Sequence, residues 1–340
     1  MSRGTDRGLN LGKLAITLPA PFLKASQCVD LARRAEQEWG YEALWLAETG
    51  GAESFALAGA LATATTSVDI GTAIVPTYNR TPAVLASGAG TVAQLSGDRF
   101  ILGLGTSSHA IIEQWNGVPF EKPLARVRDT VAILRQALAG EKTRYDGETL
   151  HSHGFRCGAM PARPVKIYLA GLREKMLQLA GEIGEGLIIN FMPVSAMPKI
   201  LGAYREGAAR AGRDASGDEI VARFQVGITD DLAGARNLVR AGFGGYVATP
   251  VYNRFFEWVG YGDVAKGVRS GFAARDRKAT AVAMTDEFVD SVTILGTAEA
   301  CREKLAAFVR AGVTTPILSP LAAGADAAAA VYEALAPARR

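Results

Sequence analysis

The sequence predicts an α/β fold in the form of a (β/α)8 TIM barrel, and two observations favour it. Short apolar segments alternate with amphipathic helical segments along most of the 340 residues. This alternation is typical of a parallel sheet covered by helices. Eight apolar segments of strand length can be counted, and that number fits a closed barrel. An open, doubly wound sheet is the alternative that the same alternation leaves open.

The predicted strands are short and mostly apolar, as expected when both faces of a parallel sheet are buried. They are Lys13–Leu18, Glu42–Ala47, Asp69–Val75, Phe100–Gly105, Val165–Ala170, Leu187–Phe191, Val221–Ile228 and Thr314–Ser319. The helices between them carry apolar residues at helical spacing, and glycine follows several of them where helices commonly end. They are Lys24–Trp39, Pro82–Leu95, Leu124–Ala139, Arg173–Ile183, Ala196–Ala211 and Ala298–Ala311, with Ala322–Ala330 as a last helix.

Two segments interrupt this rhythm and predict insertions after strands 4 and 7. Residues 141–163 contain Asp146-Gly147, a typical hairpin turn. Residues 242–296 are rich in aromatic side chains and too long for a structureless loop, so we expect an inserted helical subdomain over the catalytic face. We expect residues 1–12 to be a frayed leader and residues 13–340 to form one domain.

Composition narrows the classes of function. A net charge of +3 gives no sign of a nucleic-acid or membrane partner, and no apolar run is long enough to cross a bilayer. We therefore expect a cytoplasmic protein with a small-molecule substrate. The three cysteines are far apart, and three histidines are too few for a His-built site. His151 and His153 could share a strand face and bind a metal, but an exposed hairpin fits better, so we expect no metal.

Barrel enzymes place their sites at the C-terminal ends of the strands. Glu48 follows the second strand directly, as either a site group or a partner for a helix N-terminus. Gly171 and Arg173 follow the fifth strand where a helix begins. A helix N-terminus offers free N–H groups and the positive end of a dipole, which suits a phosphate, and glycine lets a ligand approach the backbone.

Four groups of segments, in this order along the chain, resemble the bacterial luciferase-like superfamily over about residues 14–320. They are Ile70–Pro76 with Arg80-Thr-Pro82; Phe100–Thr106, Trp115–Phe120 and Pro123–Asp129; Ile167–Gly171 with Leu179–Gly186; and Leu295–Glu299 with Ala311-Gly-Val313. Gly71–Thr77 is most similar to the branch that uses the deazaflavin coenzyme F420.

The resemblance implies specific roles. It implies a bulge with a non-proline cis peptide at Ala73–Ile74 that backs the deazaflavin ring, with Glu48 near the ring and Thr106 beside the cofactor. It also implies that Ala170, Gly171 and the stretch Leu172–Met176, including Arg173 and Met176, hold the cofactor phosphate. Barrels of this superfamily commonly pair through helices beside the second and third strands, so a homodimer is expected.

The chain departs from the glucose-6-phosphate dehydrogenases of this branch. In those enzymes a His follows the acidic residue and a Glu follows the fourth strand, whereas this chain has Thr49 and Ser108. Their proton-handling pair is therefore missing. Glu48, Thr49 and His109 are the candidate catalytic residues, because imidazole titrates near neutrality and His109 adjoins the altered position. An ordinary loop role for His109 is the alternative.

The function that the resemblance implies is F420-dependent oxidoreduction by hydride transfer, with a substrate that the residues do not identify. With FMN as the cofactor instead, the reaction would be monooxygenation of an organic substrate. A non-catalytic homologue that only binds a cofactor is the third reading.

Overall fold

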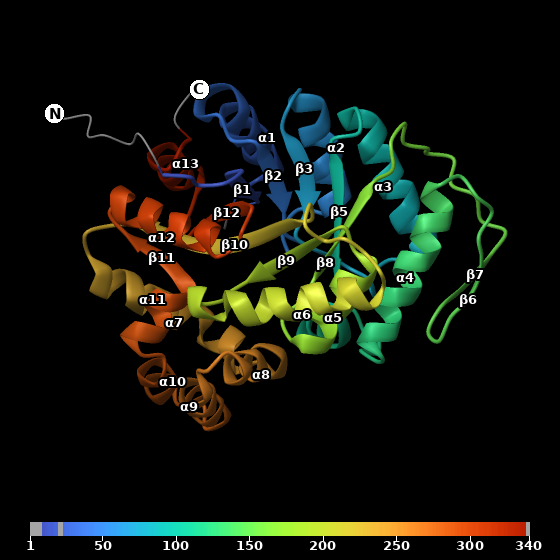
Figure 1. Ribbon diagram of the computed structural model, residues 1–340. Coiled ribbons are helices and arrows are strands. Elements are labelled where there is room, and N and C mark those ends of the chain that lie inside the picture. The colour runs from blue at the N-terminus through green and yellow to red at the C-terminus, as the bar shows by residue number, and fades with distance from the viewer. Residues whose placement is uncertain (1–8, 20–22, 338–340) are drawn as a thin grey trace.

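The computed structural model describes residues 9–19 and 23–337; residues 1–8 of the expected leader lie outside this range. Within the described residues, eight parallel strands close into a barrel in the order β1-β2-β3-β5-β8-β9-β10-β12, and β12 pairs with β1 to complete it (Figure 1). The strands are β1 (Ala15–Leu18), β2 (Ala43–Leu46), β3 (Asp69–Thr72), β5 (Phe100–Gly105), β8 (Lys166–Ala170), β9 (Gly186–Asn190), β10 (Glu219–Ile228) and β12 (Thr315–Pro320). The predicted closed barrel is confirmed, and the open sheet is excluded.

The third predicted strand is interrupted. β3 ends at Thr72, the chain bulges at Ala73 and Ile74, and β4 (Val75–Pro76) resumes the pairing with β5. The Ala73–Ile74 peptide is cis, as the resemblance implied. The buried Thr72 hydroxyl donates to the Gly103 carbonyl oxygen (2.8 Å) and accepts from the Gly103 N–H (2.9 Å). A side chain thus supplies ladder bonds that the bulged backbone does not make.

The sequence missed one strand. β11 (Thr293–Gly296) pairs in parallel with residues 225–228 of β10, above the point where β9 stops pairing with β10. We expected this segment to be the end of the helical insertion. β10 is long enough to contact β9 with its first half and β11 with its second, so the wall of the barrel is locally extended.

The barrel interior is filled by side chains rather than open. Trp45 of β2 and Tyr168 of β8 stack with ring centroids 6.1 Å apart, and both are buried. Neighbouring strands provide the space, because a Cβ on Gly71 would meet the Trp45 ring and a Cβ on Gly186 would meet the Tyr168 ring. Ala73, Ile74 and Ala170 pack against this interior cluster from its rim. This buried cluster of Trp45, Tyr168 and six smaller residues, which we call the interior plug, therefore supports the residues that follow the strands.

Helices cover the outside of the barrel near their predicted positions. They are α1 (Ala25–Arg34), which continues into a π-helical turn η1 (Ala35–Trp39), α2 (Ser54–Ala64), α3 (Pro82–Ser96), α4 (Pro123–Leu138), α5 (Glu174–Ile183), α6 (Met197–Arg210), α12 (Ala298–Arg310) and α13 (Ala325–Ala334). Gly40, at φ 74°, ends the first of these helical segments in the left-handed conformation that glycine favours.

Segment 141–163 contains the expected hairpin, formed by β6 (Arg144–Asp146) and β7 (His151–His153) beside α4 (Figure 1). The Asp129 carboxylate of α4 holds its turn by accepting from Tyr145 Oη (2.8 Å) and from the Thr149 N–H (2.7 Å). These hydrogen bonds lower the pKa of Asp129 although its burial acts in the opposite direction. Asp129 therefore anchors the turn of the hairpin to α4 through these hydrogen bonds.

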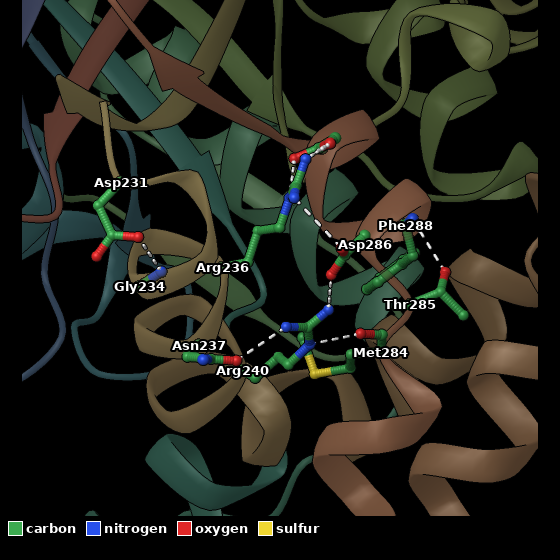
Figure 2. Close-up of polar contacts among 10 residues, drawn as sticks. Asp231, Gly234, Arg236, Asn237, Arg240, Met284, Thr285, Asp286 and Phe288 are labelled. Atoms are coloured by element: carbon green, nitrogen blue, oxygen red, sulfur yellow. Dashed lines mark hydrogen bonds and ion pairs between the residues drawn. The ribbon is translucent and has the colours of Figure 1, made fainter. Parts of the chain in front are cut away.

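The second insertion is helical but starts earlier than predicted, with α7 (Leu232–Ala248). It continues through α8 (Pro250–Trp258), α9 (Gly262–Ala273), α10 (Arg277–Ala283) and α11 (Asp286–Val292) before β11. Figure 2 shows Arg236 and Arg240 reaching from α7 toward Asp286 of α11. Arg240 also donates to the Met284 carbonyl oxygen (2.7 Å), and Arg236 pairs with Asp290 (2.6 Å). These charge pairs tie the two ends of the insertion together.

Helices α5 and α6 approach each other closely through glycine. A Cβ on Gly207 of α6 would overlap the Gln178 carbonyl oxygen of α5, and one on Gly181 of α5 would overlap the Tyr204 carbonyl oxygen of α6. Backbone contacts of this kind leave no soft side chain to move aside. The position of α5 over the barrel is therefore set by these two glycines.

We predict that Gly207→Ala lowers the free energy of unfolding by about 2 kcal/mol or more, because the added methyl group overpacks a backbone contact. Gly202→Ala in the same helix is the matched control, since nothing lies within 4 Å of a Cβ there. It should leave stability unchanged or raise it by up to about 1 kcal/mol, the helix propensity difference. Urea denaturation measures both; equal effects would contradict the packing argument.

Candidate functional site

A cavity of about 1020 Å³ lies at the C-terminal ends of the barrel strands. All of the site residues expected from the sequence line it: Glu48, Thr49, Ala73, Ile74, Thr106, His109, Ala170, Gly171, Leu172, Arg173 and Met176. Tyr246, Tyr252 and Trp258 of the helical insertion line it from above. A smaller cavity of about 520 Å³ lies outside the barrel beside α4 and the hairpin, away from the strand ends.

Glu48, directly after β2, is held by an arginine. Its two carboxylate oxygens accept from Arg80 Nη1 (2.7 Å) and Nη2 (2.8 Å), and the Ser54 N–H at the start of α2 lies 3.4 Å from Oε2. Both sequence alternatives for Glu48 therefore apply, since it lines the cavity and also faces a helix N-terminus. Burial alone would lower the pKa of Arg80, but its hydrogen bonds to Glu48 and Glu53 raise it.

Arg80 is a residue that the sequence reasoning did not assign to the site. It pairs with both Glu48 and Glu53, and its guanidinium carbon lies 5.3 Å from the centre of the Phe55 ring. The Glu48 carboxylate is therefore a charge with a fixed partner. Arg80 lies close in sequence to the bulged strand, which could have placed it near the site. Its partners Glu48 and Glu53 come from an earlier part of the chain, so the pairing itself could not be predicted.

The loop after β5 carries the altered position. Ser108, where the resemblance implied a departure from the glucose-6-phosphate dehydrogenases, places Oγ 3.4 Å from the Ile111 N–H at the start of a π-helical turn η2 (Ala110–Trp115). His109 is exposed, and its ring packs on Phe120 with centroids 4.3 Å apart. Thr49 is likewise exposed beside Glu48. The structure places Thr49 and His109 in the same cavity but gives no contact that assigns either a proton-transfer role.

The N-terminus of α5 opens into the cavity. Arg173 is its N-cap residue, with φ −125° and ψ 162°, so the helix begins at Glu174 rather than at Arg173 as the sequence predicted. No side chain caps this end, and the first N–H groups of a helix have no partners within it. A Cβ on Gly171 would lie 3.0 to 3.3 Å from Leu177 atoms. Glycine therefore lets the helix start lie against the strand end, where its N–H groups suit an anion.

A second arginine was also missed. Arg223 lies on β10, two residues after the interior residue Val221, and it lines the cavity from the barrel wall. Nη2 donates to Ser319 Oγ (2.8 Å), while Nε is buried and has no hydrogen-bond partner among the described residues. Burial lowers the pKa of its guanidinium. The alternation of side chains along a strand could have indicated an inward-facing cation here.

No cluster of three or more His, Cys, Asp or Glu side chains in the described part of the chain is arranged to hold a metal ion. His151 and His153 stack in the hairpin, and His153 pairs with Asp146 at 2.9 Å. In the same range of residues, no helix combines the length and the apolar character needed to span a membrane.

A sequence model described as luciferase-like monooxygenase matches residues 13–315, nearly the whole barrel. The chain belongs to this family. It is 30% identical to the 5,10-methylenetetrahydromethanopterin reductase of Archaeoglobus fulgidus, over 82% of this chain and 85% of the relative. It is also 30% identical to a Mycobacterium tuberculosis protein described as a candidate coenzyme F420-dependent oxidoreductase, over 94% of this chain and 96% of that one.

The fold is shared with solved structures as well. The F420-dependent tetrahydromethanopterin reductase of Methanopyrus kandleri superposes with a TM-score of 0.81, at 21% identity, over 96% of this chain and 97% of that one. The superposition extends over the insertions as well as the barrel, because it spans nearly the whole of both chains. This superposition shows the shared fold, while the family resemblance stated from the motifs is confirmed by the sequence model and the two relatives at 30% identity.

We predict that Arg80→Met lowers the free energy of unfolding by about 3 kcal/mol, because it leaves the Glu48 carboxylate without its partner in a mostly buried place. The double variant Arg80→Met/Glu48→Gln should recover much of that loss. Arg33→Met is the control, since its pair with Asp30 is exposed and is worth less than about 1 kcal/mol. A loss for Arg80→Met no larger than the control's, in guanidinium denaturation, would contradict the ion-pair assignment.

Proposed function

We propose that this chain is an F420-dependent oxidoreductase that transfers a hydride between the deazaflavin and a small organic substrate. The observation that carries the proposal is the joining of two features in one cavity: the bulge at Ala73 and Ile74, and the open N-terminus of α5. Two relatives at 30% identity, the reductase and the candidate F420-dependent oxidoreductase, support it.

The residues present fit such a cofactor. The cavity of about 1020 Å³ is at the upper end of the size range of ligand pockets, and its lining beside the bulge is mostly small or apolar. Ala73, Ile74, Thr106 and Ala170 would lie against the ring. The backbone N–H groups of Leu172 to Lys175 would hold the phosphate, because those of Gly171 and Met176 already donate to the Ile188 and Arg173 carbonyl oxygens.

When bound, the deazaflavin supplies the two-electron chemistry, and the protein supplies position and exclusion of water. Tyr246, Tyr252 and Trp258 cover the cavity and limit the access of solvent. Glu48 pairs with Arg80 at 2.7 Å, so its carboxylate has a fixed position at the rim of the site. Thr49 and Ser108 do not titrate near neutrality. His109 is therefore our candidate for any proton transfer to or from the substrate.

Titration of the purified protein with F420, FMN and NADPH, followed by fluorescence, tests the proposal. We expect tight binding of F420 alone. The variant Gly171→Val should weaken F420 binding by about tenfold or more, because a displaced helix start loses hydrogen bonds to the phosphate. Gly217→Val is the matched control, since nothing lies within 4 Å of a Cβ at that turn.

Tight FMN binding without F420 binding would overturn the proposal and favour an FMN-dependent monooxygenase. Unchanged F420 affinity in Gly171→Val would exclude this helix start as the phosphate site. Failure of the wild type to bind any of the three compounds would count against a flavin-type enzyme altogether.

We also propose that the protein forms a homodimer through α2 and α3. Val84 and Leu95 of α3 are 56% and 48% exposed, and their spacing of eleven residues places them on one helix face. The neighbouring α2 is rich in alanine, which allows close approach. The cytoplasmic location and the absence of nucleic-acid and membrane partners stay predictions from composition.

For the dimer we expect that Val84→Glu/Leu95→Glu converts the protein to a monomer in light scattering, since two buried carboxylates would oppose association. Val282→Glu, at a 71% exposed position on α10, should leave the oligomeric state unchanged. A wild type that is monomeric at micromolar concentration would reject this interface.

A further inference from the structure

Arg223 has more donors than partners in its surroundings. Its guanidinium carries five N–H groups. Within the described residues, its one hydrogen bond joins Nη2 to the neutral Ser319 hydroxyl (2.8 Å). Nε is sealed from water without an acceptor. A desolvated cation with so few partners is costly, which indicates that a ligand supplies the missing acceptors.

The acidic side chains that line the cavity are paired with other arginines or are exposed to solvent. Glu48 pairs with Arg80, and Glu257 pairs with Arg269 at 2.9 Å. Glu174 is exposed in the first turn of α5. None of these carboxylates is an ion-pair partner of Arg223. The Arg223 guanidinium on the inner wall of the cavity is therefore available to bind an anionic group of a ligand.

The strand order places Arg223 opposite the proposed cofactor platform. From β3, which leads into the bulge, β10 is reached in four steps either through β2, β1 and β12 or through β5, β8 and β9. In a ring of eight strands, four steps in either direction is the far side. A ring resting on Ala73 and Ile74 would thus have the bulge behind it and β10 across the cavity in front of it.

The wall beside Arg223 is aromatic. Arg223 pairs in register with Asn190 of β9, whose Oδ1 accepts from Tyr252 Oη at 3.0 Å. Tyr252 packs on Tyr246 with centroids 4.5 Å apart, and both line the cavity. A cation next to two aromatic rings suits a molecule with an acidic group at one end and an apolar body.

We propose that Arg223 determines substrate specificity by binding a carboxylate of the substrate, so that the enzyme acts on organic acids whose apolar body lies against Tyr246 and Tyr252. This inference rests on the proposed function for the place of the cofactor. The planar guanidinium matches a carboxylate through two parallel hydrogen bonds, which a neutral amide of the same shape cannot make.

The test uses two matched pairs of probes, benzoate with benzamide and hexanoate with hexanamide, in calorimetric titrations of the unloaded and the F420-loaded protein. The wild type should prefer at least one acid over its amide by about 10- to 100-fold, the range expected of charge-assisted hydrogen bonds. Arg223→Met should remove that preference, and Arg223→Lys should retain part of it. F420 affinity should be the same in all three proteins.

Stability separates this role from a structural one. Arg223→Met removes a partly buried cation whose Nε has no acceptor, so its denaturation midpoint should equal or exceed that of the wild type. A sharp fall in the midpoint would make Arg223 a structural residue and overturn the proposal. Equal binding of acid and amide by the wild type would also overturn it. A loss of F420 affinity in Arg223→Met would assign the residue to the cofactor instead.

Failure of the proposed function has a different signature. It would appear as a wild type that does not bind F420, whereas the preference for an acid is measured on the unloaded protein as well. The two proposals can therefore fail independently.

Discussion

The stack of Trp45 on Tyr168 inside the barrel is the constraint on which the site depends. Two large rings fill the middle of the barrel because Gly71 and Gly186 on neighbouring strands leave room for them. The barrel below the rim is thus a packed core, and a ligand can enter only above it. Ala73, Ile74 and Ala170 pack on this interior plug. The floor of the cavity is therefore as rigid as the core itself, which suits a site that must orient a flat cofactor.

The bulge shows how the sheet tolerates a break without losing its closure. β3 stops pairing with β5 after Gly71, and pairing resumes directly after the bulge with Val75 opposite Leu104. Between these points the Thr72 hydroxyl bonds to both backbone groups of Gly103. Gly103 has no Cβ that would collide with the Thr72 carbonyl group. One hydroxyl and one glycine thus keep the backbone groups satisfied where the strand turns toward the cavity.

Hydrophobic periodicity was sufficient to predict most of the fold, but it predicted little of the contacts in the site. Strands such as Phe100–Gly105 are apolar along their whole length, so their ends could be placed closely. β11 was missed because Thr293–Gly296 is four residues long and directly follows α11, and its pairing depends on the extra length of β10. Arg80 and Arg223 were missed because ion pairs and vacant hydrogen-bond donors arise from residues far apart in the chain. Glu48 was found, but its partner was not, so its role as a paired charge could not be deduced from its position.

The two arginines give the cavity an electrostatic direction that neither has alone. Arg80 is compensated by two carboxylates, so the β2 side of the rim presents Glu48 as a paired, hydrogen-bonded anion. Arg223 on β10 has a neutral serine as its partner, so that wall keeps its positive charge. An anionic molecule in the cavity would therefore find a cation with free donors at Arg223 on β10, whereas Arg80 on the β2 side is already paired. Fixed charges can thus hold a substrate in place without titrating, although Thr49 and Ser108 carry no group that titrates near neutrality.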